Sequence, residues 1–259
     1  MKNLRIYGEK PYEVLVIHGG PGAPGSVAPL ARVLSKKFGV IEPFQTEDSI
    51  KGQINELVTV IKRYCNKPIT LIGHSWGAWL SYIFTSKYSM YVEKLILVSS
   101  GPYEEKYIDT MNRTRFNRFS EEEKTKVKEL SETLYNPNTK NLTNVFKELG
   151  SIMTKVDSYE PIVYEDEIVK YQPKIFMKSM SEISKLRENG KLLDMGKNIE
   201  CPVITIHGDY DAHPYCGVKE PLAKVIKNYN FILLDKCGHY PWNEYYAKEK
   251  FYEILFNEI

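Results

Sequence analysis

The segment 73–77 reads GHSWG and places Ser75 at the centre of a GxSxG pattern. The apolar residues 69–72 precede it as an expected strand, and residues 78–82 follow as an expected helix. A serine on such a sharp strand-to-helix turn projects from the sheet, and the helix N-terminus favours developing negative charge. We therefore expect Ser75 to be the nucleophile of an acyl transfer. A serine that only caps the helix is the alternative.

A second glycine-rich segment, 18–22, reads HGGPG and closes the first long expected strand. Acyl transfer needs two N–H donors aimed at the developing oxyanion, and glycines let a backbone come close enough to supply one. We expect the donors to be the amides of Gly20 and of Trp76, the residue after the nucleophile. A phosphate-binding role is disfavoured because the chain has neither a GxGxxG pattern here nor a Walker lysine.

A serine nucleophile needs a base, and the chain offers five histidines: His18, His74, His207, His213 and His239. His239 lies on the loop after the last expected strand, and in sites built on a serine elbow the base follows the nucleophile and the acid along the chain. His18, His74 and His207 have structural explanations in a turn, an elbow and a strand end. His213 is too near Asp211 in sequence for that acid to support it from across a site. We expect His239 to be the base.

The acid that orients the base should follow the preceding strand. Two aspartates lie there, and Asp211 is further out on the loop than Asp209, which we interpret as a turn or cap residue. The order Ser75, Asp211, His239 then runs along the chain. The four cysteines show no CxxC spacing, so we expect reduced thiols, and we predict no metal ion or cofactor.

Short apolar runs alternate with helical patterns, which is typical of a mostly parallel sheet with helices on both faces, an α/β class. We expect strands at 13–17, 40–43, 69–72, 94–98, 203–207 and 231–235, with an edge strand at 4–7. We expect core helices at 27–37, 49–64, 76–88, 218–227 and 244–257.

The strand signals stop between residues 102 and 197, where charge-rich helical patterns take over. We expect residues 1–101 and 198–259 to form the core and 102–197 to form a helical lid over Ser75 that sets the substrate class. Ser120 and Glu123 form a capping box, and further helices are expected at 141–156 and 165–187. Four aromatic residues could line the pocket or form the lid's own core: Tyr103, Tyr159, Tyr164 and Phe176.

The composition excludes several classes of protein. The 259 residues are 42% hydrophobic and 26% charged with a formal net charge of +2, so neither disorder nor a polymer partner is indicated. No apolar run approaches the roughly 18 residues of a membrane span, and no signal peptide is evident. We expect a cytoplasmic protein with a small-molecule or short-peptide substrate, and neither nucleic acid nor membrane as partner.

The chain resembles proteins of the α/β-hydrolase fold, and the proline iminopeptidase family in particular, through HGGPG at 18–22, GHSWG at 73–77, residues 208–211 and residues 237–239. The resemblance implies a serine hydrolase that releases N-terminal residues, often proline, from short peptides. The family's acidic DQxGxGxS loop is absent after Pro43. The family holds the substrate amine with lid carboxylates, for which the candidates here are Glu104, Glu105, Glu160 and Glu182.

Three functions follow from these patterns. The first is an aminopeptidase of proline iminopeptidase type, the second is a carboxylesterase acting on small acyl esters, and the third is a non-catalytic binding protein on a hydrolase scaffold. An aminopeptidase needs a lid carboxylate that faces the nucleophile to pair with the substrate ammonium. An esterase would present apolar and aromatic groups there.

Overall fold

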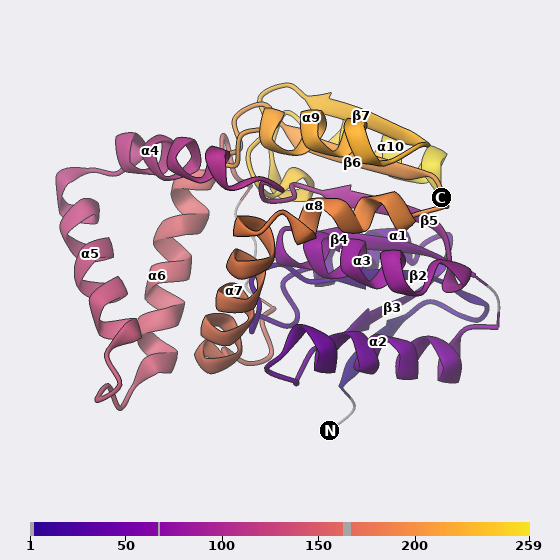
Figure 1. Ribbon diagram of the computed structural model, residues 1–259, viewed down its shortest axis with the longest axis horizontal. Helices are drawn as coiled ribbons and strands as arrows, with labels where there is room; N and C mark the ends of the chain where they lie inside the picture. The colour runs from indigo at the N-terminus through magenta and orange to yellow at the C-terminus, as the bar shows by residue number, and fades with distance from the viewer. Residues whose placement is uncertain (1–2, 67, 163–166) are drawn as a thin grey trace.

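The computed structural model describes residues 3–66, 68–162 and 167–259, which form one seven-stranded sheet in the order β1-β3-β2-β4-β5-β6-β7 (Figure 1). The strands are β1 (Leu4–Tyr7), β2 (Tyr12–Ile17), β3 (Gly39–Pro43), β4 (Ile69–His74), β5 (Val92–Val98), β6 (Val203–Gly208) and β7 (Tyr229–Leu234). β1 pairs with β3 antiparallel, and every other neighbouring pair is parallel. The predicted α/β class and mostly parallel sheet are confirmed.

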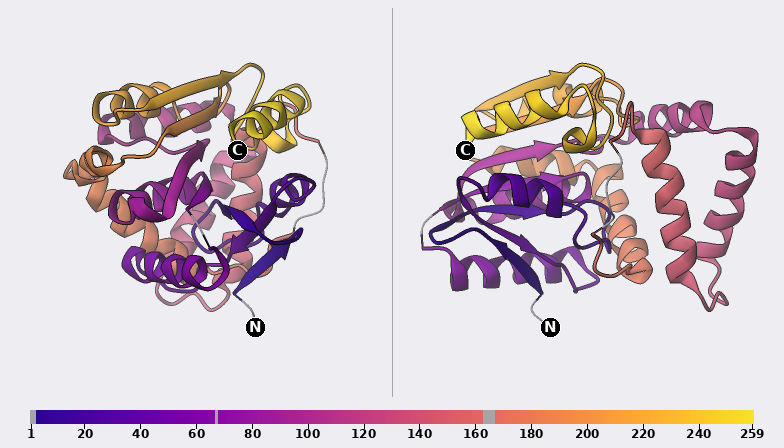
Figure 2. Two further views of the ribbon diagram at one scale, coloured as in Figure 1. Left: turned by 90° about the vertical axis from the view of Figure 1, so that its right-hand side faces the viewer. Right: turned by 180° about the vertical axis from the view of Figure 1, so that it is seen from behind.

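Helices cover both faces of the sheet (Figure 2). The core helices are α1 (Ala28–Leu34), α2 (Ile50–Tyr64), α3 (Trp76–Lys87), α9 (Cys216–Val225) and α10 (Lys248–Glu258). Side chains of α2, α3 and α9 share one buried apolar cluster with the sheet, while α1 and α10 share the cluster of the opposite face. None of the helices in the described ranges is long and apolar enough to cross a bilayer.

The register of the strands brings the chemically interesting loops to one edge of the sheet. Ile17 of β2 pairs with Gly73 of β4, so the loops that follow these two strands start side by side. β6 and β7 end together in the same way, with Gly208 paired to Leu234. Because parallel strands all end at one edge, the segments 18–22, 75–77, 209–213 and 235–239 meet there.

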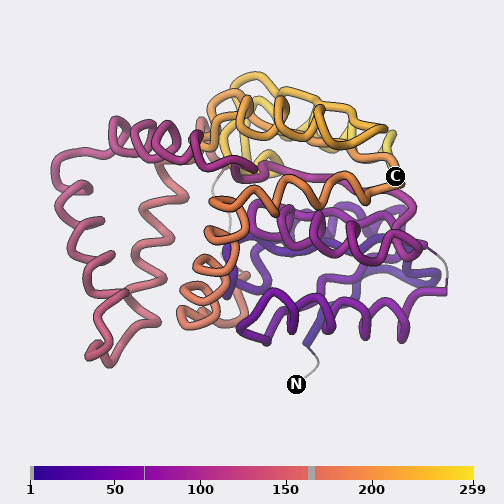
Figure 3. Tube along the Cα trace, viewed as in Figure 1, coloured from indigo at the N-terminus to yellow at the C-terminus, as the bar shows by residue number. Residues whose placement is uncertain are grey.

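Helices inserted between β5 and β6 lie beyond this edge. They are α4 (Ile108–Arg118), α5 (Glu121–Tyr135), α6 (Leu142–Asp157), α7 (Pro173–Glu188) and α8 (Lys191–Asp194). α5 and α6 extend away from the sheet as a hairpin (Figures 1 and 3). They enclose a small apolar core of their own, formed by Leu130, Leu134, Phe146 and Leu149. The predicted capping box of Ser120 and Glu123 is confirmed at the start of α5.

Two predicted helices begin later than expected. The helix expected from residue 165 begins at Pro173. Proline lacks an N–H and therefore suits the first turn of a helix. Residue 165 itself lies outside the described ranges. The helix expected from Glu244 begins at Lys248. The Glu244 carboxylate instead accepts hydrogen bonds from the backbone amides of Tyr159, Glu160 and Gly238, which fixes this stretch as a loop anchor.

Candidate active site

Ser75 lies on the tight turn between β4 and α3. Its backbone has φ 54° and ψ −114°, a conformation that non-glycine residues rarely adopt and that is typical of a nucleophile elbow. The Ser75 N–H donates to the carbonyl of Val98 at 3.0 Å, which ties the turn to the neighbouring strand. A Cβ on Gly77 would stand 2.3 Å from the carbonyl oxygen of Ile17, so the elbow requires glycine at that position.

The HGGPG loop runs beside this elbow. A Cβ on Gly19 would lie 2.5 Å from Nδ1 of His74 and 3.3 Å from the Ser75 Cβ, so the loop passes against the turn itself. Gly20 follows with φ +50°. Trp76 is the first residue of α3, and its N–H therefore has no acceptor within the helix. The two predicted oxyanion donors thus belong to segments that flank Ser75.

The structure brings the predicted acid and base together. Asp211 Oδ2 lies 2.7 Å from Nδ1 of His239, and both residues are buried. His74 Nε2 lies 2.9 Å from the carbonyl oxygen of His239, which joins the elbow to the loop that carries the base. Asp209 is engaged elsewhere, since its carboxylate accepts the N–H of Cys237 at 3.1 Å.

Ser75 and His239 come from adjoining loops without a direct bond in this structure. Within the described ranges, the hydrogen bonds of His239 run to Asp211, His74 and the carbonyl of Asp157. Nucleophile–base contacts in unliganded enzymes are commonly longer than in the substrate complex.

His213 departs from what its sequence position indicated. Its Nδ1 lies 2.8 Å from Asp211 Oδ1, and its backbone N–H donates to the same oxygen at 2.9 Å. The argument that His213 is too near Asp211 in sequence to be supported by it is therefore wrong. An aspartate side chain readily accepts the amide two residues ahead, and this local turn brings the imidazole of His213 to the carboxylate.

Burial and hydrogen bonding set the charges of this cluster. Burial alone would raise the pKa of Asp211, but the charges of His239 and His213 and their hydrogen bonds outweigh it and hold the pKa well below its usual value. Burial lowers the pKa of His213 to about 4 against the opposing attraction of Asp211. At neutral pH the site thus holds an ionised carboxylate and a neutral His213.

Asp211, His213 and His239 also have the residue types of a metal site, with ligand atoms within 4.8 Å of one another. Both Nδ1 atoms are already occupied by the Asp211 carboxylate. The Nη2 atom of Arg115 lies 3.4 Å from Nε2 of His213, so a bound cation would be repelled by the guanidinium charge. This geometry favours a hydrogen-bonded proton network over metal coordination.

The inserted helices contact the site through the end of α6. The backbone N–H of His239 donates to the carbonyl of Asp157 at 2.8 Å. The Asp157 carboxylate is buried and accepts from Nε of Arg115 at 2.9 Å and from its Nη2 at 2.5 Å. Arg118, one turn further along α4, donates to the carbonyls of Val156 and Tyr210. α4 and the end of α6 are thus fastened directly to the loops of the acid and the base.

The four candidate carboxylates of the inserted segment are placed differently. Glu105 pairs with Arg187 at 2.7 Å and Glu104 pairs with Lys106 at 3.0 Å. Glu182 accepts the N–H of Ile50 at the start of α2. Glu160 is exposed beside the loop that contains Glu244.

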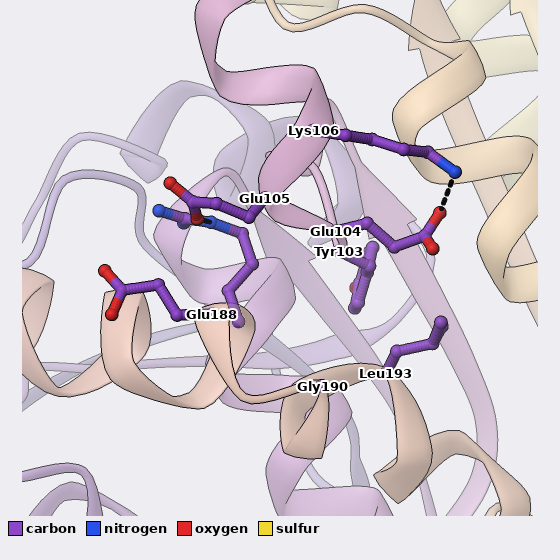
Figure 4. Close-up of a pocket in the computed structure, with 8 residues that line it drawn as sticks. Tyr103, Glu104, Glu105, Lys106, Glu188, Gly190 and Leu193 are labelled. Atoms are coloured by element: carbon purple, nitrogen blue, oxygen red, sulfur yellow. Dashed lines mark hydrogen bonds and ion pairs between the residues drawn. The ribbon is translucent and has the colours of Figure 1, made fainter.

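Glu104 and Glu105 line a cavity of about 280 Å³ where the inserted segment leaves and rejoins the core (Figure 4). The chain from Tyr103 to Lys106 forms one wall, and residues Arg187, Glu188, Gly190 and Leu193 form the other. In the close-up the Lys106 ammonium points to the Glu104 carboxylate. The cavity therefore lies between the two connections of the inserted segment to the core and is lined by residues of both.

The aromatic residues of the inserted segment do not act as one group. Tyr103 is fully buried against Tyr82 in the core, and Phe176 packs on Phe146 in the core of the inserted helices. Tyr159 is 40% exposed at the surface. Tyr164 lies outside the described residues.

The sequence did not indicate two residues of this cluster, Arg115 and Asp157, nor the contact of His213 with Asp211. The spacing Asp211-x-His213 carries a local signal, because an aspartate two residues before a histidine can accept its amide. Arg115 and Asp157 are 42 residues apart, and charged residues in helices are usually solvated, so nothing in the sequence distinguishes this pair.

Comparisons with known proteins agree with this architecture. The sequence matches no family model. It is 24% identical to the proline iminopeptidase of Saccharolobus solfataricus over 98% of this chain and 86% of that protein.

Among solved structures, an alpha/beta fold family hydrolase of Bacillus anthracis superposes with a TM-score of 0.70 at 16% identity, covering 99% of this chain and 94% of that chain. A thermophilic esterase of Thermogutta terrifontis superposes with a TM-score of 0.63 at 18% identity, covering 98% of this chain and 91% of that chain. With the parallel sheet, the elbow between β4 and α3 and the helices inserted after β5, these likenesses lead to one conclusion. The chain has the α/β-hydrolase fold.

Proposed function

We propose that the protein is a serine hydrolase that cleaves small carboxylic esters through an acyl-enzyme. The observation that carries this proposal is the 2.7 Å bond between Asp211 and His239 on loops adjoining the strained backbone of Ser75. A binding protein on this scaffold would need neither the strain at Ser75 nor a buried carboxylate on the imidazole of His239.

The reaction follows from the positions of these groups. Ser75 Oγ attacks the acyl carbon while Nε2 of His239 takes the serine proton. Asp211 holds Nδ1–H of His239 and stabilises the imidazolium that forms. The amides of Gly20 and Trp76 donate to the oxyanion, and the N-terminus of α3 adds favourable potential. His239 then returns its proton to the leaving oxygen, and a water attacks the acyl-enzyme by the same route.

The substrate class is argued from the carboxylates of the inserted segment. An aminopeptidase needs a carboxylate free to pair with the substrate ammonium. Asp157, whose backbone carbonyl accepts the N–H of His239, is neutralised by Arg115, and Glu104, Glu105 and Glu182 have partners of their own. These engagements favour an uncharged acyl substrate and reverse the order that the sequence patterns indicated. In this proposal the segment 102–197 acts as a lid that excludes water from Ser75.

Aminopeptidase activity of proline iminopeptidase type is the second candidate. Its support is the similarity to the Saccharolobus solfataricus protein, together with the exposed Glu160 on the loop after Asp157. Glu160 is joined through its backbone to the loop after His239, which makes it the carboxylate that we would test for binding of an amine.

Steady-state turnover of paired chromogenic substrates tests both candidates. One set carries acyl p-nitrophenyl esters and the other aminoacyl p-nitroanilides with a free or a blocked α-amine. We expect Ser75→Ala to lower kcat for the preferred set by about 10⁴-fold or more without unfolding the protein. A folded Ser75→Ala variant that keeps its activity would contradict the serine mechanism.

The variant Glu160→Gln separates the two candidates. Ester turnover should stay within about twofold of wild type, because an uncharged acyl group gains nothing from a carboxylate. Glu132→Gln, an exposed glutamate of the distant helix α5, is the matched control. A loss in kcat/KM confined to substrates with a free amine in Glu160→Gln, and absent in Glu132→Gln, would establish the aminopeptidase instead.

A further inference from the structure

Asp211 serves two imidazoles. Oδ2 accepts from His239 at 2.7 Å and Oδ1 accepts from His213 at 2.8 Å. The two rings are stacked, with centroids 4.4 Å apart and planes inclined by 22°. The proposed hydrolase mechanism uses only one of them, so the second ring needs an explanation of its own.

The chemistry of Arg115 fixes the state of the second ring. A guanidinium can only donate, so Nε2 of His213, 3.4 Å from Arg115 Nη2, must present its lone pair. Nδ1 of His213 then carries the proton that it donates to Asp211. His213 is therefore neutral and connects Arg115 to the Asp211 carboxylate. The position of Arg115 thus affects the position of that carboxylate.

The same arginine reaches the base by another route. Its guanidinium binds the buried Asp157 carboxylate through Nε and Nη2, and the carbonyl of Asp157 accepts the backbone N–H of His239. The contacts close a ring: Arg115, His213, Asp211, His239, Asp157 and back to Arg115. Two members come from the inserted helices α4 and α6, and three come from the loops of the core.

We propose that Arg115 is a positioning residue, which fixes the acid Asp211 through His213 and the base His239 through Asp157. This inference rests on the proposed serine hydrolase function. Its physical basis is that small displacements of an orienting group cost large factors in rate when the reacting groups must be aligned.

Several charged or titratable groups surround the imidazole of His213. The charged or titratable groups that face His213 are Asp211, His239, Arg115 and His207, whose Nε2 lies 2.9 Å from the carbonyl of His213. Burial is the main cause of the lowered pKa of His213, and the charges of His239 and Arg115 lower it further; of these two groups, Arg115 also lies within hydrogen-bond distance of Nε2. With His213 kept neutral, the charge of Asp211 remains available to the imidazolium of His239.

The test compares Arg115→Gln with Arg118→Gln. Arg118 lies on the same helix and donates to the carbonyls of Val156 and Tyr210, but among the described residues its side chain makes no hydrogen bond to a member of the ring. We expect Arg115→Gln to lower kcat about tenfold with KM within about twofold, because Arg115 does not contact substrate. Arg118→Gln should keep kcat within about twofold of wild type.

Two further variants guard against misfolding. Arg115→Gln leaves the Asp157 carboxylate buried and unpaired, which is strongly destabilising. The double variant Arg115→Gln/Asp157→Asn removes that charge and should show the same loss of kcat in a folded protein. Arg115→Lys keeps the charge without the planar fork and should recover part of the rate. Equal losses in the Arg115 and Arg118 variants, or full kcat in the folded double variant, would overturn the proposal.

A second readout does not depend on activity. In NMR titrations of the imidazole protons, the midpoint of His213 should rise in Arg115→Gln and stay at its wild-type value in Arg118→Gln. An unchanged His213 midpoint in Arg115→Gln would refute the ring even in a protein without hydrolase activity. Conversely, a raised His213 midpoint in Arg115→Gln, together with a wild-type protein that hydrolyses no substrate, would preserve the ring and refute the proposed function.

Discussion

Ser75 occupies a backbone conformation that costs of order 1–3 kcal/mol, and its neighbours must offset that cost. The bond from its N–H to Val98 and the close contact of Gly77 with Ile17 hold the turn from two sides. The strain therefore belongs to a well-packed turn, and we attribute it to the presentation of the serine hydroxyl. At this scale the elbow is surrounded by buried histidines whose pKa values are lowered by burial.

These histidines predict a loss of stability in acid. Burial lowers the pKa of His18 and of His213 to about 4, against about 6.5 in an unfolded chain. Between pH 6.5 and 4 the unfolded state binds protons at these histidines and the folded state does not. The free energy of unfolding therefore falls as the pH falls through this window. Each group accounts for a change on the order of 3 kcal/mol.

The shifted pKa values of two carboxyl groups also affect how stability depends on pH. The lowered pKa of Asp211 affects stability only below about pH 4, outside the window. Burial raises the pKa of Glu42 to about 7, so the contribution of Glu42 to the free energy of unfolding is lost as the pH rises. Its pH dependence is opposite to that of the histidines and offsets theirs only in part. Urea unfolding at pH 7, 6, 5 and 4.5 measures the balance. A free energy of unfolding that is constant or rises towards pH 4.5 would contradict the neutral, buried state of these histidines.

At the scale of elements, the hairpin of α5 and α6 has a core separate from that of the sheet. Phe146 packs there against Phe176 with ring centroids 4.8 Å apart, and the cluster also includes Leu130 and Leu134. A small core of this kind can open without unfolding of the sheet. The inserted helices should therefore respond to mutation as a unit of their own.

Phe146→Ala tests this independence. We expect the substitution to destabilise the hairpin by about 3–5 kcal/mol, since it removes a large buried ring. Hydrogen exchange should accelerate at the amides of α5 and α6 and stay unchanged in β4 and β5. Tyr245→Ala, outside the inserted helices and with its ring 66% exposed, is the control and should change neither. Equal acceleration in the strands would mean that the hairpin and the sheet unfold together.

The same scale shows what the sequence could predict. The strands that carry Ser75, Asp211 and His239 were found from apolar runs, because strand identity is a local pattern. The start of α7 was missed since the pattern continues upstream of Pro173, where the proline decides the boundary. The ring of Arg115, Asp157 and His213 was missed because it joins residues that the fold, and not the sequence, brings together.

At the scale of the whole molecule, the sheet gathers loops of its central and C-terminal strands at one edge, and the inserted helices are fastened to that edge through α4 and α6. Folds that host many functions commonly keep one core and vary the segments around its site. The engaged carboxylates of the inserted segment are the feature of this chain that favours an ester substrate.

Covalent labelling with a fluorophosphonate, followed by intact mass and peptide mapping, tests the central claim most directly. The account predicts one adduct per chain, on Ser75, that forms rapidly in the wild type. It further predicts no adduct in Ser75→Ala and at least about 100-fold slower labelling in His239→Ala, because the base is needed to activate the serine. Labelling of another residue, or an unmodified Ser75 in the folded wild-type protein, would contradict it.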